Sequence, residues 1–194
     1  MIDPKVSNLV LAPRIITIYF LMEGIMHHLI LKKSVLHIFA VLVAIVLFYP
    51  VQTPAEETIK NLKNKVEKAS KFLSKNGQSG ISEFMGQDNQ WKAEPYIFVY
   101  DLSGTIIGHP VKPKLVGRNL MGLKDIKGNM FAAEFVRIAK EKGSGWSEYW
   151  WPKPGEKKAS LKASYIMRVP GQNMLVGAGV YDVSKNDAIA MAGK

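Results

Sequence analysis

The chain has 194 residues, of which 47% are apolar and 22% are charged, and it contains no cysteine. These values are typical of a single globular domain with a real core, and the lack of cysteine excludes disulfides and thiolate metal sites. The formal net charge is +10, but the lysines are dispersed and no basic helix or base-stacking motif accompanies them. The charge therefore predicts a solvated basic surface and no nucleic-acid partner.

A predicted leader occupies residues 1–55. Its apolar run, Val35–Tyr49, follows two consecutive lysines, a pattern typical of a secretory signal and short for a spanning helix, which needs about 20 residues. Two interpretations stay open: cleavage after Ala55 would release a periplasmic protein, and retention of the run would anchor it in the inner membrane. Met26 is a second candidate start. In either case we expect the domain to lie outside the cytoplasm, where an absence of cysteine is also suitable.

The segment after the leader, residues 56–90, is expected to be the helical N-terminal part of the domain. Thr53 and Glu56 have the spacing of a capping box, and Pro54 suits the first helical position. Apolar residues then recur at spacings of three and four, which predicts one buried helical face. These residues are Ile59, Leu62, Val66, Ala69 and Phe72, and Asn76-Gly77 provides a stop.

Residues 91–183 are expected to form an α+β core. Alternation over Tyr96–Asp101 and Thr105–His109 predicts a hairpin, and the periodicity of Asn129–Lys142 predicts a helix. Three further strands are predicted over Trp146–Trp151, Leu161–Val169 and Met174–Tyr181. Because the connections are short, the sheet should be antiparallel. Residues 184–194 are expected to be a frayed C-terminal tail.

No catalytic set is evident in this sequence. His109 is the only histidine after the leader, and no partner is available to activate a serine. The carboxylates are scattered singly, no metal-ligand spacing appears, and Gly177-Ala178-Gly179 lies in a strand pattern with no helix after it. We therefore expect neither an enzyme nor a cofactor or metal site.

Several blocks between Tyr96 and Tyr181 resemble the single Cache family of extracytoplasmic sensor domains. They are the stretch GHPVKPKLVGRNLMGLKD from Gly108, the stretch GWSEYWWPKPG from Gly145, and the Lys-x-Ser-Tyr pattern at Lys162–Tyr165. The resemblance implies a PAS-like, antiparallel five-stranded sheet with a long N-terminal helix. It also implies a small-molecule site between the concave sheet and the cover Pro110–Ile126, with small organic acids as typical ligands.

The resemblance and the strand phase together suggest a set of ligand-binding candidates. Tyr149 and Trp151 share one strand face with Ser147, whereas Trp146, Glu148 and Trp150 share the other. In a regular strand Lys162 and Tyr165 point to opposite faces, so both reach the pocket only if a bulge intervenes; Tyr165 is preferred as a wall and Lys162 is kept as a donor. The full set is Tyr100, His109, Arg118, Tyr149, Trp151, Lys162 and Tyr165.

These residues also have plainer interpretations. The aromatic residues could be ordinary core, Lys162 and Arg118 could be surface cations, and His109 could cap the hairpin loop. The sequence holds no second apolar span and no output heptads after the domain, although most sensors of this family precede a kinase or a methyl-accepting coiled coil. We therefore expect a module that reports to a membrane kinase or a chemoreceptor. The alternative is a structural or protein-interaction envelope protein with a vestigial pocket.

Overall fold

The computed structural model describes residues 54–85 and 90–193, all of which belong to one compact unit, Gln52–Lys194. The predicted apolar run Val35–Tyr49 and the capping residue Thr53 lie outside the described residues. Within the described part of the chain, no helix is long and apolar enough to cross a membrane.

The long helix α3 spans Pro54–Asn76, as its apolar period predicts. Its buried face consists of Ile59, Leu62, Val66, Ala69 and Leu73. Phe72 is only partly buried and directs its ring against Phe84 and Trp91, at centroid distances of 6.0 and 5.9 Å. The last turn therefore buries Leu73, four residues after Ala69, in place of the predicted Phe72. A 3₁₀ helix, η1, follows over Gly77–Phe84.

Five strands form one antiparallel sheet in the order β2-β1-β5-β4-β3. Their bounds are β1 Phe98–Asp101, β2 Ile106–Gly108, β3 Ser144–Pro152, β4 Ala159–Arg168 and β5 Met174–Tyr181. A short 3₁₀ helix, η2, covers Pro113–Leu115 between the hairpin and helix α4, which spans Phe131–Glu141. This PAS-like α+β architecture confirms the predicted fold class.

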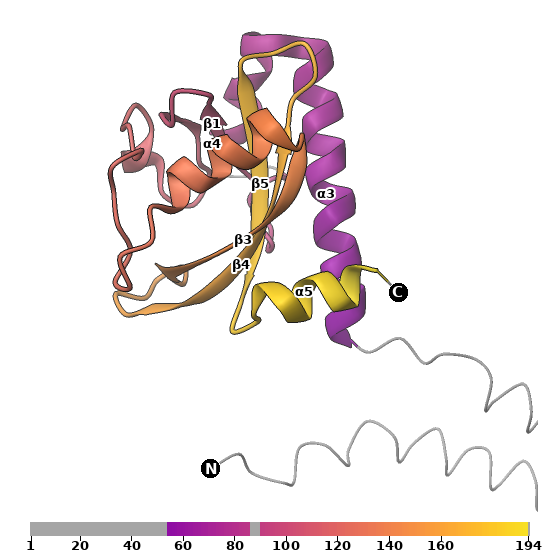
Figure 1. Cartoon of the computed structure of the whole chain (residues 1–194). Coiled ribbons are helices and arrows are strands. Elements are labelled where there is room, and N and C mark those ends of the chain that lie inside the picture. The colour runs from indigo at the N-terminus through magenta and orange to yellow at the C-terminus, as the bar shows by residue number, and fades with distance from the viewer. Residues whose placement is uncertain (1–53, 86–89, 194) are drawn as a thin grey trace, which may run out of the picture. The chain divides into compact units, whose positions relative to one another are not determined.

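The two faces of the sheet are covered by different helices (Figure 1). Helix α3 packs along one face, over a core that includes Val99, Val176 and Ala178. Helix α4 packs on the other face, over a second core that includes Phe98, Tyr149 and Leu175. Successive strand residues point to opposite faces, so each strand contributes to both cores. The second core holds three of the aromatic candidates from the sequence, Tyr100, Tyr149 and Trp151.

The C-terminal segment differs from the frayed tail that the sequence predicts. Residues Lys185–Ala192 form helix α5, whose N-cap Ser184 accepts a hydrogen bond from the backbone N–H of Asp187. Ala188 is fully buried, and Met191 packs against the same core as α3. An N-cap serine and one small buried residue suffice here because the helix rests on an existing surface.

Replacing Leu62 with alanine should destabilise the domain because Leu62 is fully buried at the centre of the α3 face. The expected loss is about 2–4 kcal/mol of unfolding free energy, the range for a buried leucine whose cavity does not collapse. Urea denaturation measures it. The neighbouring exposed substitution Asn61→Ala should stay within about 0.5 kcal/mol, and an equal loss in both variants would contradict the packing of α3 described above.

Candidate functional site

The most unusual side chain of the described structure is Lys162, which lies on β4 and is only 1% exposed. Its Nζ lies 4.1 Å from the ring centroid of Tyr96, 4.6 Å from that of Tyr181 and 5.9 Å from that of Phe98. Aromatic faces attract a cation, but within the described residues no carboxylate lies within ion-pair distance of Lys162. A buried amine without a counter-ion is costly and calls for an explanation.

Lys162 acts as the hydrogen-bond donor to both tyrosine hydroxyls beside it. Its Nζ donates to the Tyr96 hydroxyl at 2.8 Å and to the Tyr181 hydroxyl at 3.4 Å. Tyr181 donates its own hydrogen to the carbonyl oxygen of Pro152 at 3.1 Å, so Tyr96 is the donor in the 3.2 Å contact between the two hydroxyls. Both phenol hydrogens are therefore committed. A protonated Lys162 has a third N–H, which suits an additional acceptor such as a carboxylate oxygen.

Burial favours the uncharged forms of the titratable groups in this cluster. Desolvation lowers the pKa of Lys162 from 10.5 to about 7, with Glu94 raising it and Lys112 lowering it further. Burial, together with Lys162 and Lys112, lowers the pKa of His109 to about 3. Burial also raises the pKa of Tyr96 well above its ordinary value and that of Tyr181 to about 12. At neutral pH, Lys162 is thus the group in the cluster whose charge changes most readily.

His109 lies beside the lysine cluster as a neutral hydrogen-bond donor. Its ring centroid is 5.2 Å from that of Tyr96, and it is 3% exposed. Its Nδ1 accepts from the backbone N–H of Lys112 at 3.0 Å, which places the proton of the neutral imidazole on Nε2. The histidine therefore caps the loop after β2, as one of its two sequence interpretations proposed, and keeps a second nitrogen as a donor.

Aromatic rings form the wall beneath α4. Tyr149 stacks on Phe131 at 4.9 Å between centroids, and Trp151 lies 5.4 Å from Phe131. The Tyr149 hydroxyl pairs with that of Ser164 at 3.1 Å, next to Lys162 on β4. Lys112 places its Nζ 4.7 Å from the Trp151 ring centroid. The arrangement combines a water-excluding wall with a few converging polar groups, the usual composition of a small-molecule site.

Gly179 of β5 leaves the space that Lys162 occupies. A Cβ built on Gly179 would lie 2.6 Å from Cε of Lys162 and would also collide with the Ser164 hydroxyl. Gly177 has a similar role two residues earlier in the strand, where a Cβ would lie 2.5 Å from the Phe98 ring and 2.8 Å from Ile166. These close approaches explain the two glycines of the strand.

The cover over this face is held by carboxylate and amide side chains. Asp125 accepts from the backbone N–H groups of Lys127 and Asn129, at 2.8 and 2.9 Å, and from that of Trp150 on β3 at 2.9 Å. Asn119 donates to the Ser103 carbonyl at 2.8 Å and accepts from the backbone N–H of Met121 at 3.0 Å. Asp125 and Asn119 therefore fix the conformation of the loop through hydrogen bonds to its backbone.

Five of the seven sequence-predicted site residues gather in the second core, around Lys162 or the adjacent aromatic wall. They are Tyr100, His109, Tyr149, Trp151 and Lys162. Arg118 is exposed, and its backbone pairs with Ile106 at the outer edge of β2. Tyr165 lies on the other face, with its ring 5.3 Å from that of Trp146 and its hydroxyl donating to Ser144.

The position of Tyr165 follows from the regularity of β4. Pairing with β3 and β5 continues without a register shift from Ala159 to Arg168, so no bulge brings Lys162 and Tyr165 to one face. The structure therefore does not place Tyr165 as a wall beside Lys162. Its ring instead lies beneath α3, with Nζ of Lys63 at 5.7 Å from its centroid.

Sequence analysis misses three contributors to the cluster: Tyr96, Tyr181 and Lys112. Tyr96 shares the strand phase of the predicted Tyr100, which is a signal that could have identified it. Tyr181 lies directly opposite Lys162 in the β4–β5 register, but a register is not readable from one strand alone. Lys112 depends on the path of the loop after His109.

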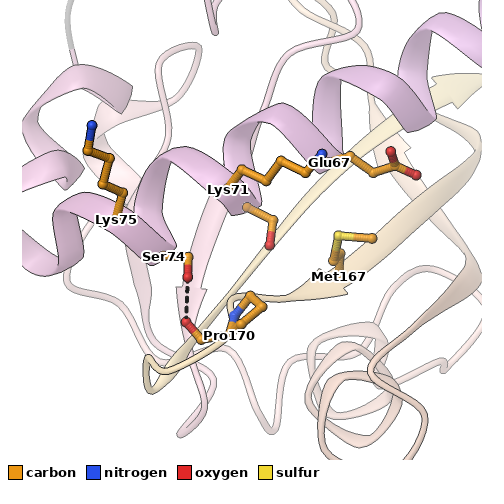
Figure 2. Close-up of a pocket in the computed structure, with 7 residues that line it drawn as sticks. Glu67, Lys71, Ser74, Lys75, Met167 and Pro170 are labelled. Atoms are coloured by element: carbon orange, nitrogen blue, oxygen red, sulfur yellow. Dashed lines mark hydrogen bonds between the residues drawn. The ribbon is translucent and has the colours of Figure 1, made fainter.

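Two surface grooves lie outside the closed cluster. One, of about 440 Å³, runs between α3 and the end of β4 and is lined by Glu67, Ser70, Lys71, Ser74, Lys75, Met167 and Pro170 (Figure 2). Its serines are already used, because Ser70 donates to the Arg168 carbonyl and Ser74 to the Pro170 carbonyl. This groove is remote from the aromatic cluster, and we assign it no binding role.

The second groove, of about 600 Å³, adjoins the cluster. Its lining includes Glu94, Lys153, Gly179 and Tyr181, and the last two also contact or confine Lys162. Glu94 is exposed to solvent, although partial desolvation of its carboxyl group raises its pKa. The groove thus brings solvent close to the Lys162 cluster. Within residues 54–85 and 90–193, no group of three histidines or carboxylates could hold a metal ion.

The chain belongs to the Cache domain family, because a family model of that description matches residues 31–189. Among curated proteins, it is 34% identical over 88 residues to the methyl-accepting chemotaxis protein McpP of Pseudomonas putida, and 37% identical over 100 residues to the sensor histidine kinase MctS of Rhizobium johnstonii. These matches cover 45% and 50% of this chain but 16% and 22% of the relatives. The chain therefore spans less than a quarter of each relative's length.

Two solved structures are similar over most of their length. A periplasmic sensor domain of a chemotaxis protein shares 26% identity at a TM-score of 0.53, over 68% of this chain and 95% of that domain. A Cache chemosensory domain, described for its carboxylic acid recognition, shares 28% identity at a TM-score of 0.53, over 66% of this chain and 93% of that domain. The present chain accordingly carries a sensor-type, ligand-binding domain and not an enzyme.

Introducing a methyl group at Gly179 should disrupt the packing around Lys162. In Gly179→Ala the new Cβ collides with the side chains of both Lys162 and Ser164 and with the backbone carbonyl of Ala163, so a loss of about 1–3 kcal/mol in unfolding free energy is expected, the range for overpacking a core. Chemical denaturation provides the measurement. Gly122→Ala is the matched control because a Cβ there meets nothing within 4 Å; equal stability of the two variants would rule out the close packing against Gly179.

Removing the amine of Lys162 should stabilise the empty domain, most strongly at low pH. The folded-state pKa of Lys162, about 7, lies below its ordinary 10.5, so the unfolded chain binds more protons and stability falls as the pH drops from 10.5 towards 7. Lys162→Met removes that penalty and should be about 1–4 kcal/mol more stable than the parent at pH 6.

The gain in Lys162→Met should shrink as the pH rises to 10, and denaturation at both pH values measures it. The exposed substitution Lys158→Met controls for the change in net charge and should show no such trend. A gain that is the same at pH 6 and pH 10 would mean that Lys162 keeps its charge throughout this range.

Proposed function

We propose that this chain is an extracytoplasmic sensor module that binds a small organic acid as its carboxylate. The ligand would lie beneath the cover that follows β2, with one carboxylate oxygen accepting from Nζ of Lys162. The module would report binding to a membrane kinase or a chemoreceptor. The observation that carries this proposal is the burial of Lys162, at 1% exposure, without a carboxylate partner among the described residues.

The neighbours of Lys162 match the needs of a carboxylate. A buried carboxylate requires a cation and several donors, because it is otherwise very costly to desolvate. Lys162 supplies the cation, and Nε2–H of His109 is a further donor on the same side of the sheet. Tyr149 and Trp151 provide apolar surface for the remainder of a small acid.

Binding requires the cluster to open, because His109, Tyr149 and Lys162 are each 3% exposed or less. Two boundaries could move. One is the cover, held to β3 through the contact of Asp125 with the Trp150 amide. The other is Tyr181, which separates Lys162 from the groove of about 600 Å³. We favour the cover, since a few hydrogen bonds hold it whereas Tyr181 belongs to a central strand.

The relatives support the signalling part of the proposal. Both curated relatives are receptors, a chemotaxis protein and a sensor kinase, and one similar solved domain is described as periplasmic. We therefore propose that the domain works outside the cytoplasm and passes its state to a signalling partner of this kind.

A thermal-shift screen of the full chain against small mono- and dicarboxylates tests the binding proposal. A ligand at about 100 times its dissociation constant should add about 2.7 kcal/mol of stability. Lys162→Met should weaken binding by about 2–5 kcal/mol, the scale for removing one partner of a buried charge pair. Arg118→Ala should leave the affinity unchanged, since Arg118 is exposed at the edge of β2.

Other outcomes would redirect the assignment. A large loss in Arg118→Ala would mean that the cover carries this arginine inward on binding. Unchanged affinity in both variants would mean that the ligand is neutral or cationic and is held by aromatic residues such as Tyr149.

A structural or protein-interaction role is the second candidate. It is favoured by the complete filling of the cluster by its own side chains, with Tyr96 and Lys162 both 1% exposed. Such a vestigial pocket would give no thermal shift with any carboxylate. Tyr149→Ala would then change stability alone, and a pull-down from envelope fractions would recover a partner equally well with parent and variant.

A further inference from the structure

We propose that ligand binding at this site is coupled to proton uptake: Lys162 is only partly protonated in the empty domain at neutral pH and becomes fully protonated when an anionic ligand enters. The affinity for a carboxylate therefore falls as the pH rises through neutrality. This inference rests on the proposed function, since it concerns the same site, and it makes the sensor respond to pH as well as to its ligand.

The geometry supplies the reason. Lys162 is enclosed by Tyr96, Tyr181 and Phe98, whose ring centroids lie 4.1–5.9 Å from Nζ. Aromatic rings and hydroxyl lone pairs stabilise the ammonium group of Lys162 less than a carboxylate would, and the enclosure excludes the water that could solvate it. A bound carboxylate adds the missing negative charge at hydrogen-bond distance and so favours the ammonium form. Burial accordingly lowers the pKa of Lys162 in the empty site to about 7, and a bound carboxylate should raise the pKa of Lys162 again.

The charged and titratable groups around Lys162 come from every element packed against it. Glu94 and Tyr96 precede β1, Tyr100 belongs to β1, His109 and Lys112 follow β2, Tyr149 belongs to β3 and Tyr181 to β5. Burial raises the pKa of all four tyrosines and lowers that of His109 to about 3. The four tyrosines and His109 therefore stay neutral between pH 6 and pH 9.

Two neighbours can tune the coupling, and in opposite directions. Glu94 raises the pKa of Lys162 and Lys112 lowers it. Glu94→Gln should therefore move the midpoint of the affinity curve to lower pH, and Lys112→Met should move it to higher pH while keeping an apolar stem over Trp151. These opposed shifts separate titration of Lys162 from titration of Lys112 itself, because the pH dependence persists in Lys112→Met.

Calorimetric titration of the full chain with acetate, at pH 6 to 9 and in pairs of buffers with different ionisation enthalpies, measures the coupling. If the bound form stays protonated, the association constant should fall roughly 90-fold from pH 6 to pH 9, and about half a proton should be taken up per acetate at pH 7. In parallel, NMR of ¹³Cε-labelled lysine in the ligand-free protein should show one lysine titrating near pH 7. That signal should be absent in Lys162→Arg.

Lys162→Arg supplies a control for the binding arm as well. An arginine stays charged over this range, so any acetate binding that Lys162→Arg retains should be independent of pH. Proton uptake that persists in Lys162→Arg overturns the assignment to Lys162.

The outcomes distinguish the two proposals. A dissociation constant that stays the same from pH 6 to pH 9, with heats independent of the buffer, overturns the coupling and leaves the carboxylate site standing. A lysine signal near pH 7 with no binding at pH 6 of acetate or of any other small mono- or dicarboxylate overturns the carboxylate site and the coupling with it. A Lys162 that titrates above pH 10 in the empty protein overturns the coupling directly.

Discussion

The interaction on which the site depends is the enclosure of the Lys162 amine between Tyr96 and Tyr181, on the sheet face that α4 covers. Many features of the local structure follow from it. Gly179 lacks a side chain where Cε of Lys162 passes, and Tyr181 commits its hydrogen to the Pro152 carbonyl so that its lone pairs face the amine. His109 is held neutral by burial and by the nearby cations. In the empty domain these contacts accommodate the amine, but within the described residues no carboxylate neutralises it.

Because the sheet has a separate core on each face, the domain can stay folded although this cluster is destabilising. Helix α3 and the opposite sheet face form an ordinary apolar core, with Leu62, Val66 and Val176 fully buried. That core needs nothing from the polar cluster, so the ligand face can hold a destabilising lysine while the fold persists. A site that is strained when empty and relaxed when filled gives a ligand a large differential effect on the domain, which is the requirement for any ligand-driven change of state.

The sequence was sufficient to predict the fold, and the reasons are physical. Period-two alternation in β3 separates Tyr149 and Trp151 from Trp146, and the structure confirms that separation. Whether Lys162 or Tyr165 faces the site could not be predicted in the same way, because the pattern of β4 alone does not reveal which face α3 covers. Tyr181 required the β4–β5 register. Helix α5 was missed since its eight residues gain stability from docking and carry almost no apolar periodicity of their own.

The central claim is that the amine of Lys162 is the anchor for an anionic ligand, and a crystal structure of the domain grown in the presence of acetate or a larger carboxylate tests it most directly. The account predicts a carboxylate oxygen within about 3 Å of Nζ of Lys162, with the cover displaced and Tyr149 and Trp151 against the rest of the acid. A structure in which Lys162 keeps its tyrosine contacts, while the acid occupies the groove beside Glu94 or the one along α3, would contradict it.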